Sequence, residues 1–239
     1  MERWPSGLRQ QVANLRPLIA VPWVRIPLSP PDNMKNIYLT SEGALVIPKI
    51  IADIGRTGLK VVLIFTASEL KEGPRVWIQN EKQALIISGC EVSEYTFTGK
   101  NADQVEKDLN PFDVIFVCGG NTFYLLQQIQ LSGSVNLIRK LVENGKIYIG
   151  SSAGSVVAGP DIYPTYMLDR AEQAPNLKGY QGLGLTDILV FPHWGTERFR
   201  ERYLPQRMEH AFTPNHKIVL LTDSQYLKIQ DQNINFVQI

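Results

Sequence analysis

Two adjacent serines lie between glycines in residues 148–159, YIGSSAGSVVAG. Gly150 to Gly154 fits the pattern Gly-x-Ser-x-Gly, with Ser152 at its centre. In a turn from strand to helix, small neighbours let the two elements pack closely. The central hydroxyl then lies at the helix N-terminus, where backbone N–H groups stabilise negative charge. We interpret Ser152 as a nucleophile and its neighbour Ser151 as structural; the alternative is that Ser152 only caps the helix.

A serine hydroxyl needs a base that accepts its proton. The chain has three histidines. His193 ends the apolar run 187–193, so we expect it at the same edge of the sheet as Ser152. His210 lies in a charged helical segment and His216 in a turn, and both are typical of solvated surface residues. His193 is therefore the candidate base.

A third group must orient that base. Asp223 ends the next apolar run, 217–223, and is our preferred acid, although the composition TDSQ is also that of an ordinary turn. Asp169 and Asp187 are alternatives because both lie between the serine and the histidine in the chain. If either is the acid, the chain order Ser, acid, His leaves an α/β-hydrolase open.

Two glycines follow another apolar run at residues 119–120. Glycine lets a backbone N–H face a site with no side chain in the way, so the N–H of Gly120 suits an oxyanion hole. The second donor would be the N–H of Ala153, the residue after the nucleophile. The alternative is a phosphate cradle, although the segment lacks the lysine and the spacing of a P-loop.

Apolar runs alternate with helical patterns from Met34 onward. We predict strands over residues 35–40, 59–67, 91–97, 112–120, 146–152, 187–193 and 217–223, and a terminal hairpin over 225–239. We predict helices over residues 44–58, 74–89, 101–109, 121–133, 134–145 and 196–212. This alternation indicates one α/β domain over residues 34–239, with a mostly parallel sheet and helices on both faces. Ligands bind beyond the carboxyl ends of such strands, which is where the candidate residues lie.

The composition excludes several classes of function. The net charge of +1 gives no electrostatic case for nucleic acid or a membrane surface. No apolar run approaches the ~18 residues that a spanning helix needs. Cys90 and Cys118 lack the spacing of a metal site or a disulfide framework, which fits a reducing compartment, so we expect a cytoplasmic protein without a metal.

Residues 1–33 stand apart because they are rich in Arg and Pro and lack periodicity. They do not form a good signal peptide, since prolines interrupt every apolar stretch. One interpretation is an irregular N-terminal extension. We prefer another: VRIPLSP, residues 24–30, can be encoded by the T-loop of a transfer-RNA gene, so these residues would be a mis-assigned start and the protein would begin at Met34.

Four segments in the order CGGNTFYLL, YIGSSAGSVVAG, FPHWG and LTDSQ resemble the peptidase E family of serine peptidases. This family includes aspartyl dipeptidase and is related to cyanophycinase. The resemblance covers Met34 to the C-terminus. It implies a fold like that of class I glutamine amidotransferases and flavodoxin. It also implies hydrolysis of a peptide bond through an acyl-enzyme, without metal or cofactor.

The resemblance also assigns roles residue by residue. Ser152 matches the family's nucleophile, His193 its base, and Gly120 and Ala153 its oxyanion donors. For the acid, the resemblance offers the position of Asp223, where aspartyl dipeptidase has Glu, and as the alternative an Asp nearest to Asp169.

Substrate binding is assigned to Asn121 and Arg202. A substrate with an N-terminal aspartate offers a carboxylate that an arginine fork would bind, and Arg202 falls where that dipeptidase has an arginine. The alternative for Arg202 is a solvated residue on a charged helix face. Ser155 stands where the dipeptidase has Ala, and Trp194 follows the histidine, so specificity can differ.

The predicted function is a serine-type exopeptidase that acts on short peptides, including dipeptides with N-terminal Asp. The predicted partner is a small peptide substrate, with no nucleic acid and no membrane, and a homodimer is left open. Two alternatives also remain. One is cyanophycinase-like cleavage of an aspartate–arginine polymer, which we rank low because the chain is short. The other is a non-catalytic flavodoxin-like module that binds a phosphate with GGNT.

Overall fold

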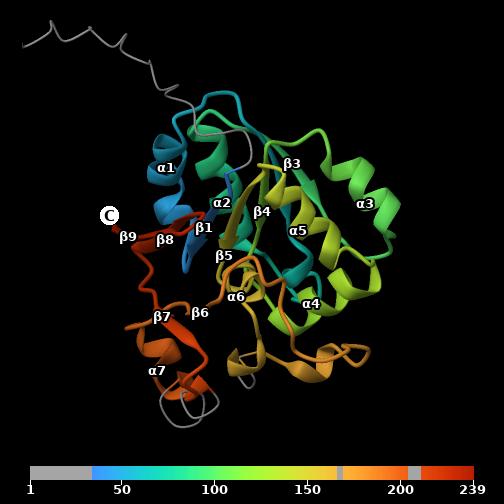
Figure 1. Cartoon of the computed structure of the whole chain (residues 1–239), viewed down its shortest axis with the longest axis vertical. Coiled ribbons are helices and arrows are strands. Elements are labelled where there is room, and N and C mark those ends of the chain that lie inside the picture. The colour runs from blue at the N-terminus through green and yellow to red at the C-terminus, as the bar shows by residue number, and fades with distance from the viewer. Residues whose placement is uncertain (1–33, 166–168, 204–210) are drawn as a thin grey trace, which may run out of the picture. The chain divides into compact units, whose positions relative to one another are not determined.

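The computed structural model describes residues 34–165, 169–203 and 211–239. Its core is a seven-stranded sheet in the order β3-β2-β4-β5-β1-β8-β9 (Figure 1). These strands are β1 Asn36–Thr40, β2 Lys60–Ile64, β3 Glu91–Tyr95, β4 Val114–Val117, β5 Ile147–Ser151, β8 Gln225–Gln230 and β9 Asn233–Gln238. The first five run parallel, and the terminal hairpin β8–β9 continues the sheet antiparallel beyond β1. The predicted α/β class with a mostly parallel sheet is confirmed.

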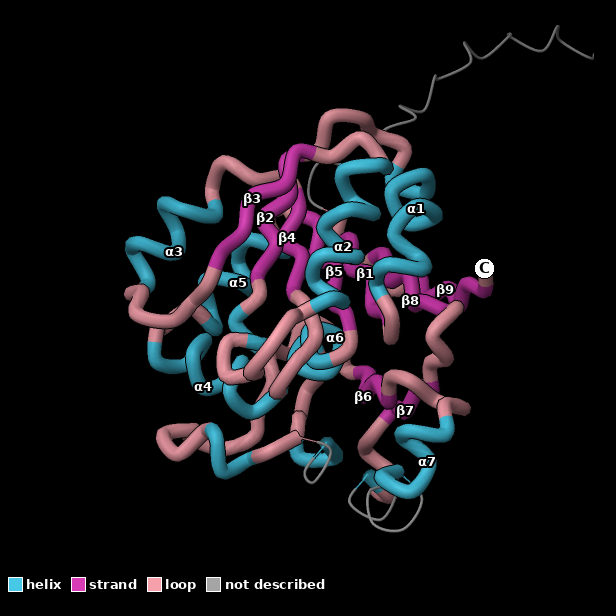
Figure 2. The backbone as a smooth tube through the Cα atoms, turned by 180° about the vertical axis from the view of Figure 1, so that it is seen from behind, coloured by secondary structure: helices cyan, strands magenta, loops and turns pink. Residues whose placement is uncertain are grey.

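Helices cover both faces of this sheet, as Figures 1 and 2 show from opposite sides. Among the described residues, the α-helices are α1 Gly43–Ile54, α2 Val76–Ile87, α3 Ala102–Leu109, α4 Thr122–Leu131, α5 Val135–Glu143, α6 Ala153–Ala158 and α7 Glu197–Tyr203. The short 3₁₀ turns there are η1 Thr66–Ser68, η2 Tyr163–Thr165 and η3 Ala171–Gln173. Two apolar cores form because alternate strand residues face opposite ways. One core lies under α1 and α2, and the other under α3 to α6.

Most predicted elements form near their predicted places. The predicted cap Asn101 begins α3 with a capping box, in which Asn101 and Gln104 satisfy each other's backbone N–H groups. The helix predicted to end at Gly58 ends earlier, because Gly55 adopts a left-handed conformation (φ 69°) that closes α1. The helix predicted over residues 196–212 begins as α7, and its residues 204–210, including His210, lie outside the described part of the chain.

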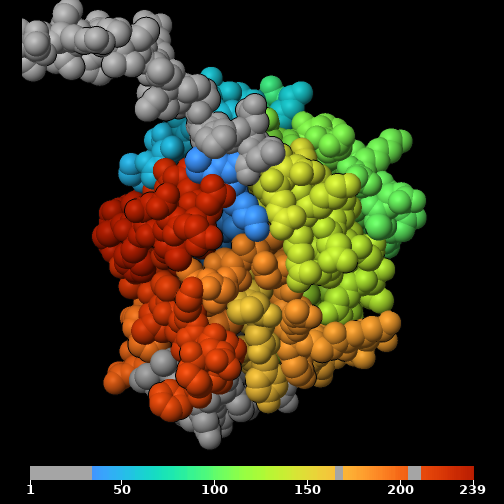
Figure 3. Space-filling model, viewed as in Figure 1, coloured from blue at the N-terminus to red at the C-terminus, as the bar shows by residue number. Residues whose placement is uncertain are grey.

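Two predicted strands do not join the central sheet. β6 Ile188–Phe191 and β7 Lys217–Leu220 pair with each other in a separate parallel sheet. In the space-filling view, the orange and red C-terminal segments that carry this small sheet lie below the blue and green elements (Figure 3). A small apolar cluster that includes Phe191 and Tyr203 joins it to α7. The prediction that residues 1–33 lie outside the domain concerns residues that are not described, and it stays a prediction.

Candidate active site

Ser152 occupies a strained turn between β5 and α6. Its φ of 49° and ψ of −107° are rare for a residue with a side chain, and its N–H donates to the Thr40 carbonyl at 3.0 Å. The flanking glycines are required by close packing. A Cβ at Gly150 would lie 2.5 Å from the Gly154 carbonyl oxygen, and a Cβ at Gly154 would lie 2.1 Å from the carbonyl oxygen of Val117. The Gly-x-Ser-x-Gly pattern therefore lets β4, β5 and α6 meet and exposes one hydroxyl.

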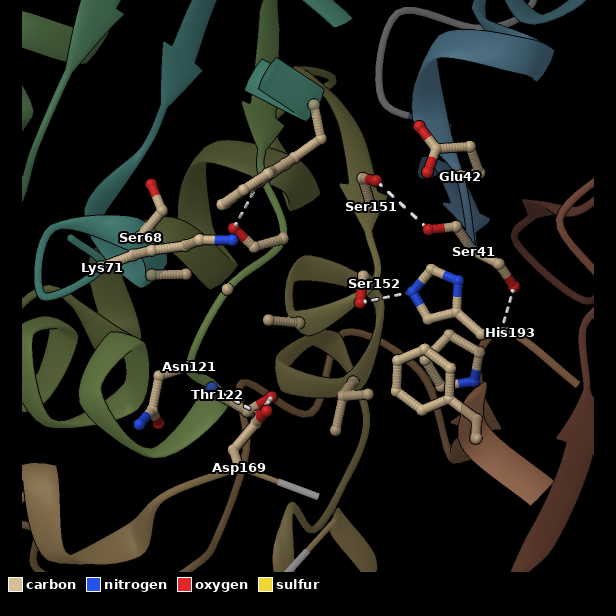
Figure 4. A pocket seen from close by; sticks show the side chains of 18 of the residues that line it. Ser41, Glu42, Ser68, Lys71, Asn121, Thr122, Ser151, Ser152, Asp169 and His193 are labelled. Carbon is tan, nitrogen blue, oxygen red and sulfur yellow. Dashed lines mark hydrogen bonds between the residues drawn. The ribbon is translucent and has the colours of Figure 1, made fainter. Parts of the chain in front are cut away.

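The three preferred candidates form one hydrogen-bonded series. Ser152 Oγ lies 2.9 Å from His193 Nε2 (Figure 4). On the other side of the ring, His193 Nδ1 lies 2.7 Å from Asp223 Oδ1. In this arrangement the ring can accept the serine proton on one nitrogen while the carboxylate holds the other. The neighbouring Ser151 points away, with its Oγ accepting the N–H of Gly43 at 3.2 Å.

The expected reason for this meeting was wrong. His193 does not share a sheet with Ser152, since it follows β6 of the small sheet. Ser41, just after β1, joins the two sheets instead. Its hydroxyl accepts the N–H of His193 at 2.9 Å and donates to the Leu221 carbonyl at 2.8 Å. Asp223 likewise follows a strand that is only half-buried, not a fully buried one.

The imidazole is also held from α7. The Phe199 ring stacks on that of His193 with centroids 4.7 Å apart and planes 13° apart. Tyr203, one turn further on, donates to the Pro192 carbonyl at 2.6 Å. Neither residue carried a signal in the sequence, because each acts through a contact that only the fold creates.

The alternative acids lie against other partners. Asp169 Oδ2 accepts the N–H of Thr122 at 2.9 Å and its hydroxyl at 2.6 Å, so this carboxylate caps the N-terminus of α4. Asp187 forms an ion pair with Lys217 of β7. The Asp169 carboxylate also occupies the helix N-terminus that the alternative phosphate cradle would need.

Gly120 and Ala153, whose N–H groups are the two predicted oxyanion donors, line the same cleft as Ser152. A Cβ at Gly119 would lie 3.0 Å from Ser152 Cβ, so the glycine turn lies directly against Ser152. Gly120 has a φ of 150°, and a Cβ there would lie 2.3 Å from the Ala67 carbonyl oxygen. Within the described residues, the N–H groups of Gly120 and Ala153 have no hydrogen-bond acceptor. Their role as oxyanion donors stays a prediction.

The two residues predicted to bind substrate differ in whether their polar groups already have partners within the described part of the chain. The Asn121 amide oxygen accepts the N–H groups of Phe123 and Tyr124, and its NH₂ donates to Arg170 and Gln173, so every polar group of this side chain is already bound. Substrate binding by Asn121 would require these bonds to be exchanged. Arg202 lines the cleft, is exposed and forms no ion pair within the part of the chain that the structure describes.

Two carboxyl groups at this site were not predicted. Glu42 follows β1 next to Ser41, and burial raises its pKa, with the nearby His193 acting in the opposite direction. Glu81 of α2 is 1% exposed, and burial raises its pKa to about 7 despite hydrogen bonding from Ser151 and Cys118. Glu42 could have been found by the strand-end rule, whereas Glu81 lies mid-helix and carries no such signal.

These residues line one cleft of about 700 Å³. Its lining includes both basic and acidic residues. The basic ones are Lys71, Arg170, Arg198 and Arg202, and the acidic ones are Glu42, Glu72, Glu81, Asp169 and Asp223. No group of three or more His, Cys, Asp or Glu side chains among the described residues could hold a metal ion. No helix in that part of the chain is long and apolar enough to cross a membrane.

Comparison with known proteins gives consistent matches. A family model described as peptidase family S51 matches residues 38–237. An uncharacterized peptidase of Listeria monocytogenes is 31% identical over 202 residues, which is 84% of this chain and 97% of that protein. A protein named peptidase E from Nostoc sp. is 32% identical over 130 residues, 52% of each chain. A crystal structure of a Listeria monocytogenes protein provisionally named peptidase E has a TM-score of 0.79, 30% identity, and coverage of 86% of this chain and 99% of that one.

Proposed function

This chain belongs to peptidase family S51, and from that membership we propose that it is a serine-type peptidase that hydrolyses short peptides through an acyl-enzyme on Ser152. The single observation that carries the serine assignment is the series Ser152–His193–Asp223, with distances of 2.9 and 2.7 Å. Such a series supplies a nucleophile, its base and the group that orients the base.

In the proposed reaction, His193 Nε2 takes the proton from Ser152 Oγ while that oxygen attacks the scissile carbonyl carbon. Negative charge develops on the carbonyl oxygen, and the N–H groups of Gly120 and Ala153 bind it. The Asp223 carboxylate stabilises the imidazolium and keeps its ring in place. His193 then gives the proton to the leaving amine, and water, activated by the same ring, releases the acyl group.

Covalent labelling tests this proposal without knowledge of the natural substrate. A fluorophosphonate is expected to label the wild-type chain at one site, with the modified peptide containing Ser152. Ser152→Ala should abolish labelling, whereas Ser151→Ala should keep the label on Ser152. Labelling that persists in Ser152→Ala, or a folded wild-type chain that takes up no label, would reject the serine mechanism.

We propose further that the substrate carries a carboxylate next to the scissile bond, as an N-terminal aspartate does. Arg202 supports this, because its guanidinium lies 5.7 Å from the centroid of the Phe199 ring, which itself stacks on His193. A guanidinium at that place can bind a carboxylate with two hydrogen bonds.

A dipeptide panel tests the specificity separately from the mechanism. Asp-Leu, Leu-Leu and a β-linked Asp-Arg should be offered to the wild type, Arg202→Gln and Arg200→Gln. Arg200 is a matched control, since it lies two residues away and pairs with Glu197. We expect Asp-Leu to be preferred and this preference to fall about tenfold or more in Arg202→Gln only. Preferred cleavage of Leu-Leu would discard the aspartate specificity and keep the serine mechanism.

A further inference from the structure

The peptide group between Gly119 and Gly120 has two polar ends. In a trans peptide the C=O and the N–H point in opposite directions, and no described peptide is cis. The direction of the Gly119 carbonyl therefore sets the direction of the Gly120 N–H, which is the proposed oxyanion donor. A group that holds the carbonyl also holds the donor.

The sequence itself does not fix this peptide. Two consecutive glycines allow many backbone conformations, including ones in which the peptide is turned over and the N–H points away from Ser152. The peptide that follows is fixed, because the Asn121 N–H donates to the Ala67 carbonyl at 2.7 Å. The peptide that carries the donor needs a partner of its own.

Trp77 supplies that partner. Its indole Nε1 donates to the Gly119 carbonyl oxygen at 3.3 Å, across 42 residues of chain. The indole is half-buried at the start of α2 and packs against the apolar core under α1 and α2. The Lys71 ammonium lies 4.2 Å from the ring centroid on the cleft side. The ring is thus held by the core and by a cation, and its N–H reaches the glycine turn.

We propose that Trp77 is a positioning residue for the oxyanion hole: its indole N–H holds the Gly119–Gly120 peptide in the orientation that aims the Gly120 N–H at the reacting carbonyl. This inference rests on the proposed serine mechanism. Trp77 touches no reacting atom and acts only through the peptide. When the indole N–H is lost, the Gly120 N–H is still present, but the peptide that carries it can turn and point the N–H away from the reacting carbonyl for part of the time.

The test removes one hydrogen bond and keeps the aromatic ring. Trp77→Phe lacks the indole N–H. Tyr95→Phe is the matched control, because it removes the hydroxyl of an aromatic side chain, which donates to Asp108, and Tyr95 does not line the cleft. We expect Trp77→Phe to slow fluorophosphonate labelling of Ser152 and to lower kcat by about three- to tenfold, with KM changed less than about twofold. Complete loss of an oxyanion donor lowers kcat more, by about 10²- to 10³-fold. Tyr95→Phe should match the wild type in all three quantities.

A second readout separates positioning from general damage. A peptide boronic acid forms a tetrahedral adduct with the serine, and its affinity should weaken in Trp77→Phe by the same factor as kcat/KM. The affinity of the amino acid that is the acyl product of the preferred dipeptide, which is planar at its carboxylate carbon, should not change. If Trp77→Phe folds poorly, a variant with benzothiophene in place of the indole serves instead, because it keeps both rings and lacks only the N–H. This variant should show the same slower labelling and the same weaker binding of the boronic acid.

The outcomes distinguish the two proposals. Equal labelling rates in the wild type, Trp77→Phe and the benzothiophene variant would overturn the positioning role and leave the serine mechanism intact. A loss of labelling with equally weakened product binding would also overturn it, since the change would then be structural. A folded wild-type chain that is never labelled removes the serine mechanism, and the inference fails with it.

Discussion

Two aspartates at this site have different hydrogen-bond partners, and we expect different roles from them. Asp223 and Asp169 both line the cleft, and both were candidates for the acid of the series. Asp223 Oδ1 lies 2.7 Å from the imidazole, whereas Asp169 accepts two hydrogen bonds from Thr122. Sequence separation could not distinguish them, because the segment that carries Asp169 reaches α4 only in the folded chain.

Isosteric amides provide a matched comparison of these two residues. Asp223→Asn should lower kcat by about 10²- to 10⁴-fold, because an amide no longer stabilises the imidazolium and favours the wrong ring tautomer. Asp169→Asn should lower kcat less than about fivefold, since its oxygen still accepts the Thr122 N–H. Steady-state hydrolysis of the preferred dipeptide, or the labelling rate, measures both. A larger loss in Asp169→Asn would transfer the role of the acid to Asp169.

At the scale of elements, the position of Ser152 depends on how closely β4 and α6 approach. The Val117 carbonyl of β4 lies where a side chain at Gly154 would have to go. We expect Gly154→Ala to lower the free energy of unfolding by about 3 kcal/mol or more, because α6 must move. Gly89→Ala is the control: its φ is 85° and nothing lies near its Cβ, so only the left-handed conformation is strained, at about 1–2 kcal/mol. Urea unfolding of both variants checks this, and equal losses would argue against tight packing at the elbow.

The sequence predicted the elements better than their assembly. Buried strands such as β2 and β4 were found because continuous apolar runs are typical of parallel strands covered on both sides. The same signal at β6 did not reveal that this strand pairs with β7 in a second sheet, because an apolar run does not indicate which strand it pairs with. Trp77 was missed for a similar reason, since its hydrogen bond joins residues 42 positions apart.

At the scale of the whole molecule, the site exists because two sheets meet. Ser152 comes from the central sheet, whereas His193 and Asp223 follow strands of the small sheet. The Ser41 hydroxyl, just after β1 of the central sheet, binds the backbone just after β6 and β7. All three candidates follow strands, as expected, and lie within hydrogen-bond distance of one another, while their catalytic roles stay a prediction. The expected reason for their closeness was wrong, because the three residues do not lie at the edge of one sheet. Ser152 lies at an edge of the central sheet, His193 and Asp223 lie at an edge of the small sheet, and tertiary packing brings these two edges together.

Stability of the whole chain should depend on pH through Glu81. Burial raises its pKa from 4.5 to about 7 in the folded protein. Below pH 4.5 the group is protonated in both states and has no effect. Between pH 4.5 and about 7 the unfolded chain loses the proton while the folded chain retains it, so the free energy of unfolding falls as pH rises. Above about pH 7 the penalty is constant, at about 3 kcal/mol.

Glu81→Gln removes this titration and keeps the size of the side chain. Relative to the wild type, its free energy of unfolding should rise by about 3 kcal/mol between pH 4.5 and 7.5, as measured by urea unfolding at half-unit steps. The exposed Glu91 of β3 is the control, because Glu91→Gln should give a difference from the wild type of less than about 0.5 kcal/mol across that range. If the difference between Glu81→Gln and the wild type does not change with pH, Glu81 is ionised in the folded chain across this range, and the raised pKa is wrong.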